Sequence, residues 1–196
     1  MAFLIDNCIR TLLTEKMVKL CEPFDCGNED LNEFFREDAI AYGRQLMGKT
    51  YVFTELTNPL KIVCAFTVSN ASIFTNHLPN ARKKKVGKEL PQTKRDLIYP
   101  AVLIGRLGVG EKYKGKHVGT ELMDYIKSWF TDTDNKTGCR YLVVDAYNEE
   151  VPLSYYQANG FQFMFSTEDQ EKTYRKIDSV DSLKTRMMYF DLIQIV

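Results

Sequence analysis

Apolar and polar residues recur along this chain with two different periods, and the changes of period mark the predicted elements. Residues 28–46 carry apolar side chains at helical spacing, and Asn28 stands where a capping residue begins a helix. Two short apolar runs, 50–56 and 61–68, predict strands, and Asn58-Pro59 between them is a turn signal. This part of the chain therefore predicts one helix followed by a hairpin.

The middle of the chain predicts a strand–helix–strand unit. Residues 99–109 are apolar on both faces, as in a central strand, and residues 140–147 form a second buried run. Between them, residues 119–130 have apolar side chains at helical spacing. Such βαβ units are parallel, and ligands bind at the carboxyl ends of their strands.

The last third of the chain predicts a short helix and two further strands. The helix covers residues 149–159 and ends at Gly160, and the strands cover 161–165 and 185–196. With the hairpin on the other side of the βαβ unit, the sheet is mixed. The expected fold is α/β (α+β), a central mixed β-sheet flanked by helices.

Composition and charge narrow the function classes. The chain has 196 residues, which favours one domain, and a formal net charge of +0, so no global charge points to nucleic acid or membrane. No run reaches the length of a membrane span, and the first residues lack the pattern of a secretory signal. The five cysteines lack paired spacing, so we expect reduced thiols, no metal site and a cytoplasmic location.

The turn Tyr113–Gly119 is the strongest candidate for chemistry. Gly115 and Gly119 stand at the start of the predicted helix 119–130, where unpaired N–H groups and the helix dipole favour an anion. Lys114 and Lys116 add positive charge. A glycine turn between strand and helix is also an ordinary connection, so the turn alone leaves both interpretations open.

Three motifs, in the order in which they occur along the chain, resemble those of a known superfamily. Residues 103–109 (LIGRLGV) and 113–119 (YKGKHVG) resemble the strand and pyrophosphate loop, Q/R-x-x-G-x-G/A, of the GNAT superfamily of N-acetyltransferases. Residues 155–161 (YYQANGF) are similar to its Tyr-x-x-x-Gly-Phe element. The segment 24–27 (FDCG) with 31–32 and Ala39 resembles the TacT/AtaT-type toxin acetyltransferases. The resemblance covers nearly the whole chain.

The resemblance implies a single GNAT-like domain over residues 1–196, whose acetyl-CoA-binding core covers about 99–166. The implied cofactor contacts are Leu107, Gly108, Val109, Lys114, Gly115, Lys116, His117, Val118, Gly119 and Thr120. Two of them depart from the pattern, because Lys114 replaces Gln or Arg and His117 replaces a glycine. His117 is either an exposed residue at the helix start or a hydrogen-bond donor to phosphate.

The same resemblance implies the catalytic groups. The Val109 N–H would be the oxyanion donor, and Tyr156 the general acid toward the departing thiolate, because a phenol is protonated at neutral pH. Tyr155, its neighbour, and a purely structural role for Tyr156 remain alternatives. The strand 101–109 carries no carboxylate, which leaves Asp145 and Glu149 as the candidates for a general base.

A weak or missing base favours an acceptor whose amine is already partly neutral. An α-amine has a pKa of about 8 and lysine about 10.4, so an aminoacyl-tRNA-like acceptor fits. A basic loop from Arg82 to Arg95 is a solvated surface, a tRNA footprint or a contact for the adenosine 3′-phosphate of the cofactor. Members of the family often dimerise, which makes a homodimer one option for this chain. The run 185–190 is either part of such an interface or, as is more common for Met, Tyr and Phe, part of the core.

Three functions remain open at this stage. The first is acetyl transfer to a primary amine, including toxin-type acetylation of aminoacyl-tRNA. The second is a non-catalytic acyl-CoA-binding protein. The third is a nucleic-acid binder that uses the fold as a scaffold.

Overall fold

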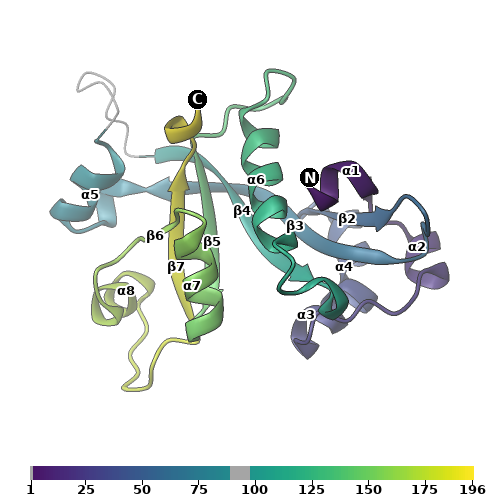
Figure 1. The fold of residues 1–196 in the computed structure, drawn as a ribbon. Coiled ribbons are helices and arrows are strands. Elements are labelled where there is room, and N and C mark those ends of the chain that lie inside the picture. The colour runs from purple at the N-terminus through teal and green to yellow at the C-terminus, as the bar shows by residue number, and fades with distance from the viewer. Residues whose placement is uncertain (1, 89–97) are drawn as a thin grey trace. The chain divides into compact units, whose positions relative to one another are not determined.

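The computed structural model describes residues 2–88 and 98–196. Its helices are α1 (Phe3–Asn7), α2 (Glu15–Leu20), α3 (Glu29–Glu33), α4 (Ala39–Arg44), α5 (Asn80–Val86), α6 (Val118–Thr131), α7 (Glu150–Ala158) and α8 (Glu168–Arg175). Its strands are β1 (Cys8–Leu12), β2 (Lys49–Glu55), β3 (Ile62–Phe74), β4 (Ile98–Val109), β5 (Tyr141–Tyr147), β6 (Gln162–Phe163) and β7 (Thr185–Asp191) (Figure 1).

The strands form one mixed sheet of seven in the order β1-β2-β3-β4-β5-β7-β6. Only the β4–β5 pair is parallel among the described pairings, with Ala101 opposite Tyr141 and Leu103 opposite Val143. The pairs β1–β2, β2–β3, β5–β7 and β6–β7 are antiparallel. The predicted βαβ unit and the mixed sheet are thus confirmed.

The described residues form two compact units, and β3 and β4 each contribute to both. The first unit comprises the chain up to Ser69 and Ile104–Trp129, and the second comprises Asn70–Leu103 and Phe130–Val196.

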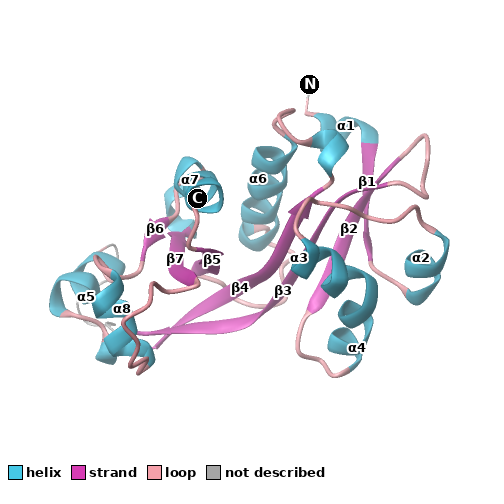
Figure 2. Cartoon of the chain, turned by 90° about the horizontal axis from the view of Figure 1, so that it is seen from below, coloured by secondary structure: helices cyan, strands magenta, loops and turns pink. Residues whose placement is uncertain are grey.

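In the first unit, helices cover both faces of the sheet because the strands alternate. Tyr51 and Phe66 stack with ring centroids 5.6 Å apart, and Trp129 of α6 meets Tyr51 edge-on at 4.9 Å. On the other face, Val52 and Ala65 pack in one cluster with Phe34, Phe35 and Ala39. Figure 2 shows α6 on one side of these strands and α3 with α4 on the other.

The predicted helix 28–46 forms as α3 and α4, joined by a π-helical turn at Phe34–Asp38. Asn28 caps it as expected, since its side chain accepts a hydrogen bond from the Leu31 N–H at 3.1 Å. The N–H of Ala39 bonds to the Phe34 carbonyl across the wider turn. This insertion keeps both phenylalanines and Ala39 on the buried face.

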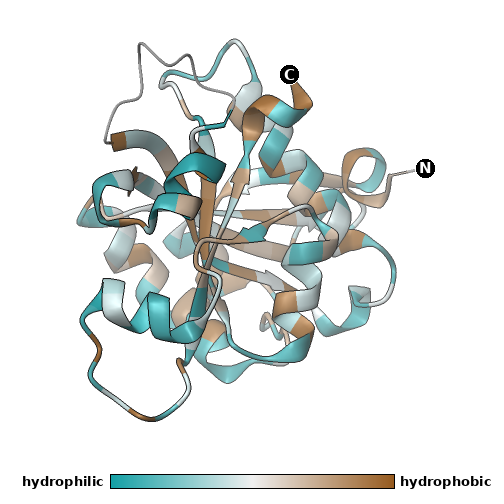
Figure 3. Cartoon of the chain, turned by 90° about the vertical axis from the view of Figure 1, so that its left-hand side faces the viewer, coloured by the Kyte–Doolittle hydropathy of each residue, from teal (hydrophilic) through white to brown (hydrophobic). Residues whose placement is uncertain are grey.

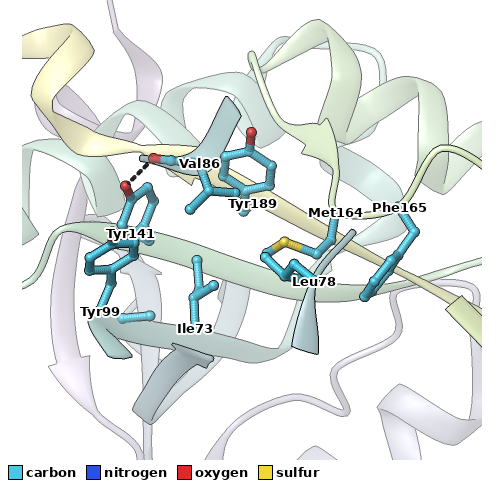
Figure 4. Close-up of a cluster of buried hydrophobic side chains, with 9 residues drawn as sticks. Ile73, Leu78, Val86, Tyr99, Tyr141, Met164, Phe165 and Tyr189 are labelled. Atoms are coloured by element: carbon cyan, nitrogen blue, oxygen red, sulfur yellow. Dashed lines mark hydrogen bonds between the residues drawn. The ribbon is translucent and has the colours of Figure 1, made fainter. Parts of the chain in front are cut away.

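In the second unit, a cluster rich in aromatic residues fills the space between α5, α8 and the sheet. Tyr99, Tyr141 and Tyr189 pack there, and the Tyr141 hydroxyl donates to the Val86 carbonyl at 2.6 Å (Figure 4). Figure 3 shows the matching hydropathy pattern, with apolar strands and helices that alternate apolar and polar stripes. The second unit therefore has its own core.

Two strand predictions were too long. The predicted strand 161–165 forms only the two residues of β6, and Met164 and Phe165 instead enter the buried cluster. The predicted strand 185–196 ends at Asp191, whose side chain caps a 3₁₀ turn over Leu192–Ile195. The first difference arises because burial of Met164 and Phe165 does not require a β-ladder, whereas Ile193, Ile195 and Val196 at the end of the second run are exposed.

The short elements α1, α2, α5 and α8 were not predicted, because five to eight residues show little periodicity. The five cysteines are free. No described helix is long and apolar enough to cross a bilayer.

Candidate active site

The turn after β4 is fixed at its start by backbone hydrogen bonds within the first unit. The Gly110 N–H donates to the Val63 carbonyl at 2.9 Å, and the Glu111 N–H donates to the Asp25 carbonyl at 2.9 Å. A 3₁₀ turn over Glu111–Tyr113 follows and leads into residues 114–117 and α6. The turn is therefore tied to β3 and to the FDCG segment.

The backbone of the turn has the conformation that its pattern requires. Gly115 has φ +71° and His117 has φ +62°, both in the left-handed region. This region favours glycine, so His117 takes the conformation of the glycine that it replaces. The His117 side chain is exposed. Of the two interpretations offered above, its exposure agrees with a residue that begins the helix.

The turn also presents free N–H groups. The first helical hydrogen bond of α6 runs from the Glu121 N–H to the His117 carbonyl at 3.0 Å. The described residues give the N–H groups of Lys116, His117, Val118 and Thr120 no partner. Free N–H groups at the positive end of a helix of 14 residues favour an anion.

The side chains of the turn contribute less than its backbone. The Lys114 ammonium pairs with Glu111, and the Lys116 ammonium donates to the Lys112 carbonyl at 2.8 Å. Val118 is buried in the core. Both lysines are exposed, so their charges could reorient toward a phosphate, whereas Val118 offers only its N–H.

The end of β4 packs against the FDCG segment. A Cβ at Gly108 would lie 3.1 Å from both Cβ and Sγ of Cys26 and 3.3 Å from the Phe24 ring, so only glycine fits without displacement. Cys26 is held there because its N–H donates to the Asn32 side chain at 2.9 Å. This contact brings the LIGRLGV and FDCG motifs side by side in the first unit, which the sequence alone did not show.

Asp25 completes this local network. Its carboxylate accepts from the Gly27 N–H at 2.8 Å and from the Asn32 amide at 2.9 Å, and these bonds lower its pKa. Arg106, on β4, is exposed, lies with its guanidinium 5.0 Å from the centre of the Phe34 ring, and donates to the Gly105 carbonyl. Among the described residues it has no carboxylate partner. The guanidinium is thus available to an anionic group.

The YYQANGF element lies in the second unit. Gly160 has φ +81°, ends α7 and directs Phe161 into the core, where its ring lies 5.7 Å from that of Phe190. The Tyr156 ring packs edge-on to Phe161 at 5.4 Å and to Tyr155 at 5.1 Å. The YYQANGF element therefore forms the end of α7 and fixes the orientation of the Tyr156 ring.

Burial raises the pKa of Tyr156, so the phenol is protonated across the neutral range. No described residue hydrogen-bonds its hydroxyl, and the ring is half-buried. These properties suit a proton donor.

The two candidates for a general base differ. Asp145, on β5, forms an ion pair with Arg175 of α8, which holds it in a structural role. Glu149 is exposed at the start of α7 and makes no side-chain capping bond. Only Glu149 keeps a carboxylate without a described partner. No group of three or more His, Cys, Asp or Glu in the described chain is placed to hold a metal.

The predicted basic loop is partly helical. Arg82, Lys83, Lys84 and Lys85 lie in α5, whereas Lys94 and Arg95 fall outside the described residues. Lys84, Lys85 and Lys88 are exposed. The prediction of a loop was wrong for 82–85, since these residues continue a helix that buries Val86.

The run 185–190, offered above as an interface, forms most of β7. Met188, Tyr189 and Phe190 are buried in the second unit, so these three side chains are not available at a surface.

No family model matches this chain. Solved structures match it along nearly its whole length. A mutant of KacT is 19% identical over 97% of this chain and 98% of that chain, with a TM-score of 0.69. AtaT complexed with acetyl-methionyl-tRNAfMet is 19% identical over 96% of each chain, with a TM-score of 0.64. AtaTR bound with AcCoA is 19% identical over 97% and 96%, with a TM-score of 0.65.

At these identities the likeness establishes the fold and not the activity. The mixed sheet of seven strands and its parallel β4–β5 pair agree with that fold. The chain therefore has the GNAT fold, in the form shared with KacT and AtaT, as its sequence motifs predicted.

Proposed function

We propose that this chain is an acetyl-CoA-dependent N-acetyltransferase that acetylates a primary amine by direct attack. The observation that carries the proposal is the 114–117 turn, where Gly115 and His117 are left-handed and the N–H groups of Val118 and Thr120 at the start of α6 have no described partner. The crystal structure of AtaTR, which has the same fold, contains bound AcCoA. Acetyl-CoA would supply an activated acyl group as a thioester.

The N–H groups of residues 115–120 would hold the pyrophosphate, and the segment 107–109 would hold the acyl arm. The Val109 N–H would donate to the thioester oxygen as negative charge builds there, an interaction of about 3 kcal/mol in comparable sites. Tyr156 would donate its proton to the departing thiolate. The Tyr156 hydroxyl has no described partner and stays protonated at neutral pH, and these two properties support that role.

The acceptor would be an amine of low pKa, because Glu149 is the only candidate base without a described partner. An α-amine is roughly one-tenth neutral at pH 7, whereas lysine is roughly one part in a few thousand. AtaT, with the same fold, is complexed with acetyl-methionyl-tRNAfMet. Aminoacyl-tRNA is therefore the first acceptor to test, and exposed Lys84, Lys85 and Lys88 are the cations that could meet its phosphates.

Calorimetric titration with acetyl-CoA tests the proposal, with one glycine variant in the turn and a control glycine variant outside it. A Cβ at Gly115 or at Gly138 would meet no atom within 4 Å, but only Gly115 has a positive φ. Gly115→Ala should weaken binding about tenfold, because a left-handed L-residue costs about 1–2 kcal/mol. Gly138→Ala should bind like the wild type, and His117→Gly should bind at least as tightly.

Turnover is measured separately as release of CoA thiol with a panel of amines and with aminoacyl-tRNA. Binding with turnover supports the proposal. Binding without turnover on any acceptor would instead indicate a non-catalytic acyl-CoA-binding protein. No binding by either the wild type or His117→Gly would refute the proposal, and salt-sensitive tRNA binding alone would then favour a nucleic-acid binder.

A further inference from the structure

The helix α1 near the start of the chain is capped by a residue more than one hundred positions away. The N–H groups of Phe3 and Leu4 donate to the two carboxylate oxygens of Glu121, at 2.9 Å and 2.7 Å. The N-cap residue Ala2 offers no side-chain bond, so Glu121 supplies the cap. Leu4 is 1% exposed, which anchors α1 in the core of the first unit.

Glu121 lies in the first turn of α6, directly after the proposed pyrophosphate turn. Its own N–H makes the first helical hydrogen bond of α6, to the His117 carbonyl at 3.0 Å. The residue therefore joins two helix starts. Its backbone N–H bonds to the last residue of the 114–117 turn, and its carboxylate accepts the first N–H groups of α1.

The other end of the turn is also in contact with α1. The Phe3 ring lies 5.8 Å from the Tyr113 ring. Tyr113 is 6% exposed, and its hydroxyl donates to Glu55 at 2.5 Å, which in turn pairs with Lys61 at 3.3 Å. Tyr113 precedes the turn and Glu121 follows it, so α1 touches both ends.

We propose that α1 braces the 114–117 turn, and that Glu121 and Phe3 are positioning residues for acetyl-CoA binding. The proposal rests on the function proposed above. Neither residue needs to contact the cofactor, because each acts through the backbone of the turn. Without the contacts to α1, the 114–117 turn would populate other conformations. The apparent affinity for acetyl-CoA would then fall in proportion to the fraction of molecules whose turn keeps the conformation that binds it.

Hydrogen exchange of the free protein and calorimetry with acetyl-CoA test the brace together. Glu121→Ala removes both hydrogen bonds, whereas Glu121→Gln keeps one amide oxygen as acceptor. The matched control is Asp124→Ala, an exposed acid in the same helix whose ion pair with Lys127 spans 3.8 Å. Phe3→Ala tests the second contact without altering charge.

We expect faster exchange in residues 2–7 of Glu121→Ala and, within 113–121, at the hydrogen-bonded amides of Tyr113, Lys114 and residue 121, with unchanged exchange in β5 and β7. Acetyl-CoA affinity should fall about tenfold in Glu121→Ala and about threefold in Glu121→Gln and Phe3→Ala. Asp124→Ala should match the wild type in both assays.

The outcomes separate the two proposals. If the wild type does not bind acetyl-CoA, the proposed function fails, and exchange of the free protein still decides whether α1 braces the turn. If the wild type binds and folded Glu121→Ala binds equally well, the brace is refuted. Faster exchange in residues 2–7 with no change in 113–121 would also refute it, because α1 would then open without affecting the turn.

Discussion

Replacing Glu171 by alanine should strongly destabilise the second unit. Glu171 lies in α8 with its side chain 0% exposed, and it accepts three hydrogen bonds or ion pairs. The Arg186 Nε donates to it at 2.8 Å, the Met187 N–H at 2.7 Å, and Arg175 pairs with it at 2.7 Å. The carboxylate therefore fixes the polar 167–184 segment to the first half of β7.

The size of the loss in stability follows from the groups that Glu171→Ala would leave without their partner. Removing one partner of a buried ion pair costs about 3–5 kcal/mol, because the other charge stays buried. Arg175 keeps its pair with Asp145 and is 22% exposed, so it can be rehydrated. Arg186, 11% exposed, and the Met187 N–H cannot move to water as easily. We expect a loss of about 3 kcal/mol in the free energy of unfolding.

Urea unfolding measures this loss. Asp169→Ala is the matched control, because it removes the same charge from the exposed face of α8 and should cost under about 0.5 kcal/mol. The double variant Glu171→Ala/Arg186→Ala should lose less than the sum of the single losses, because it leaves no unpaired charge from that pair. A Glu171→Ala value within about 0.5 kcal/mol of the control would refute the reasoning.

Tyr156→Phe should lower turnover on the order of 100-fold while acetyl-CoA affinity is unchanged, and an equal loss of both would contradict its role as the acid. Gly160→Ala should lower the free energy of unfolding by about 1–3 kcal/mol, since φ is +81° and a Cβ would lie 3.0 Å from a phenylalanine ring; an unchanged urea midpoint would contradict this. The pKa of Glu168 is lowered from 4.5 by the Leu183 N–H and by Asn148, so its contribution is present above pH 4.5 and is lost as the pH falls through the folded value. Glu168→Gln should therefore flatten the loss of stability as the pH falls below 4.5, and unfolding curves with the wild-type slope there would be inconsistent with it.

The sequence determined the elements whose signals are local. The helix from residue 28, the hairpin and the βαβ unit were predicted because apolar periodicity, caps and turn residues act over a few neighbouring positions. The three motifs, read in order, led to the fold that the solved structures share. The short helices and the two-residue β6 had no comparable local signal.

Only the tertiary structure decided which distant residues complete the site. The motif places a glycine where His117 stands, but only the structure shows that His117 keeps the left-handed backbone of that glycine. The contact of Cys26 with Gly108 and the cap that Glu121 provides for α1 join segments 82 and more than 110 residues apart. Such contacts depend on how strands and helices pack. The residues that flank a carboxylate or a thiol in the sequence do not indicate which distant group it will contact in the folded chain.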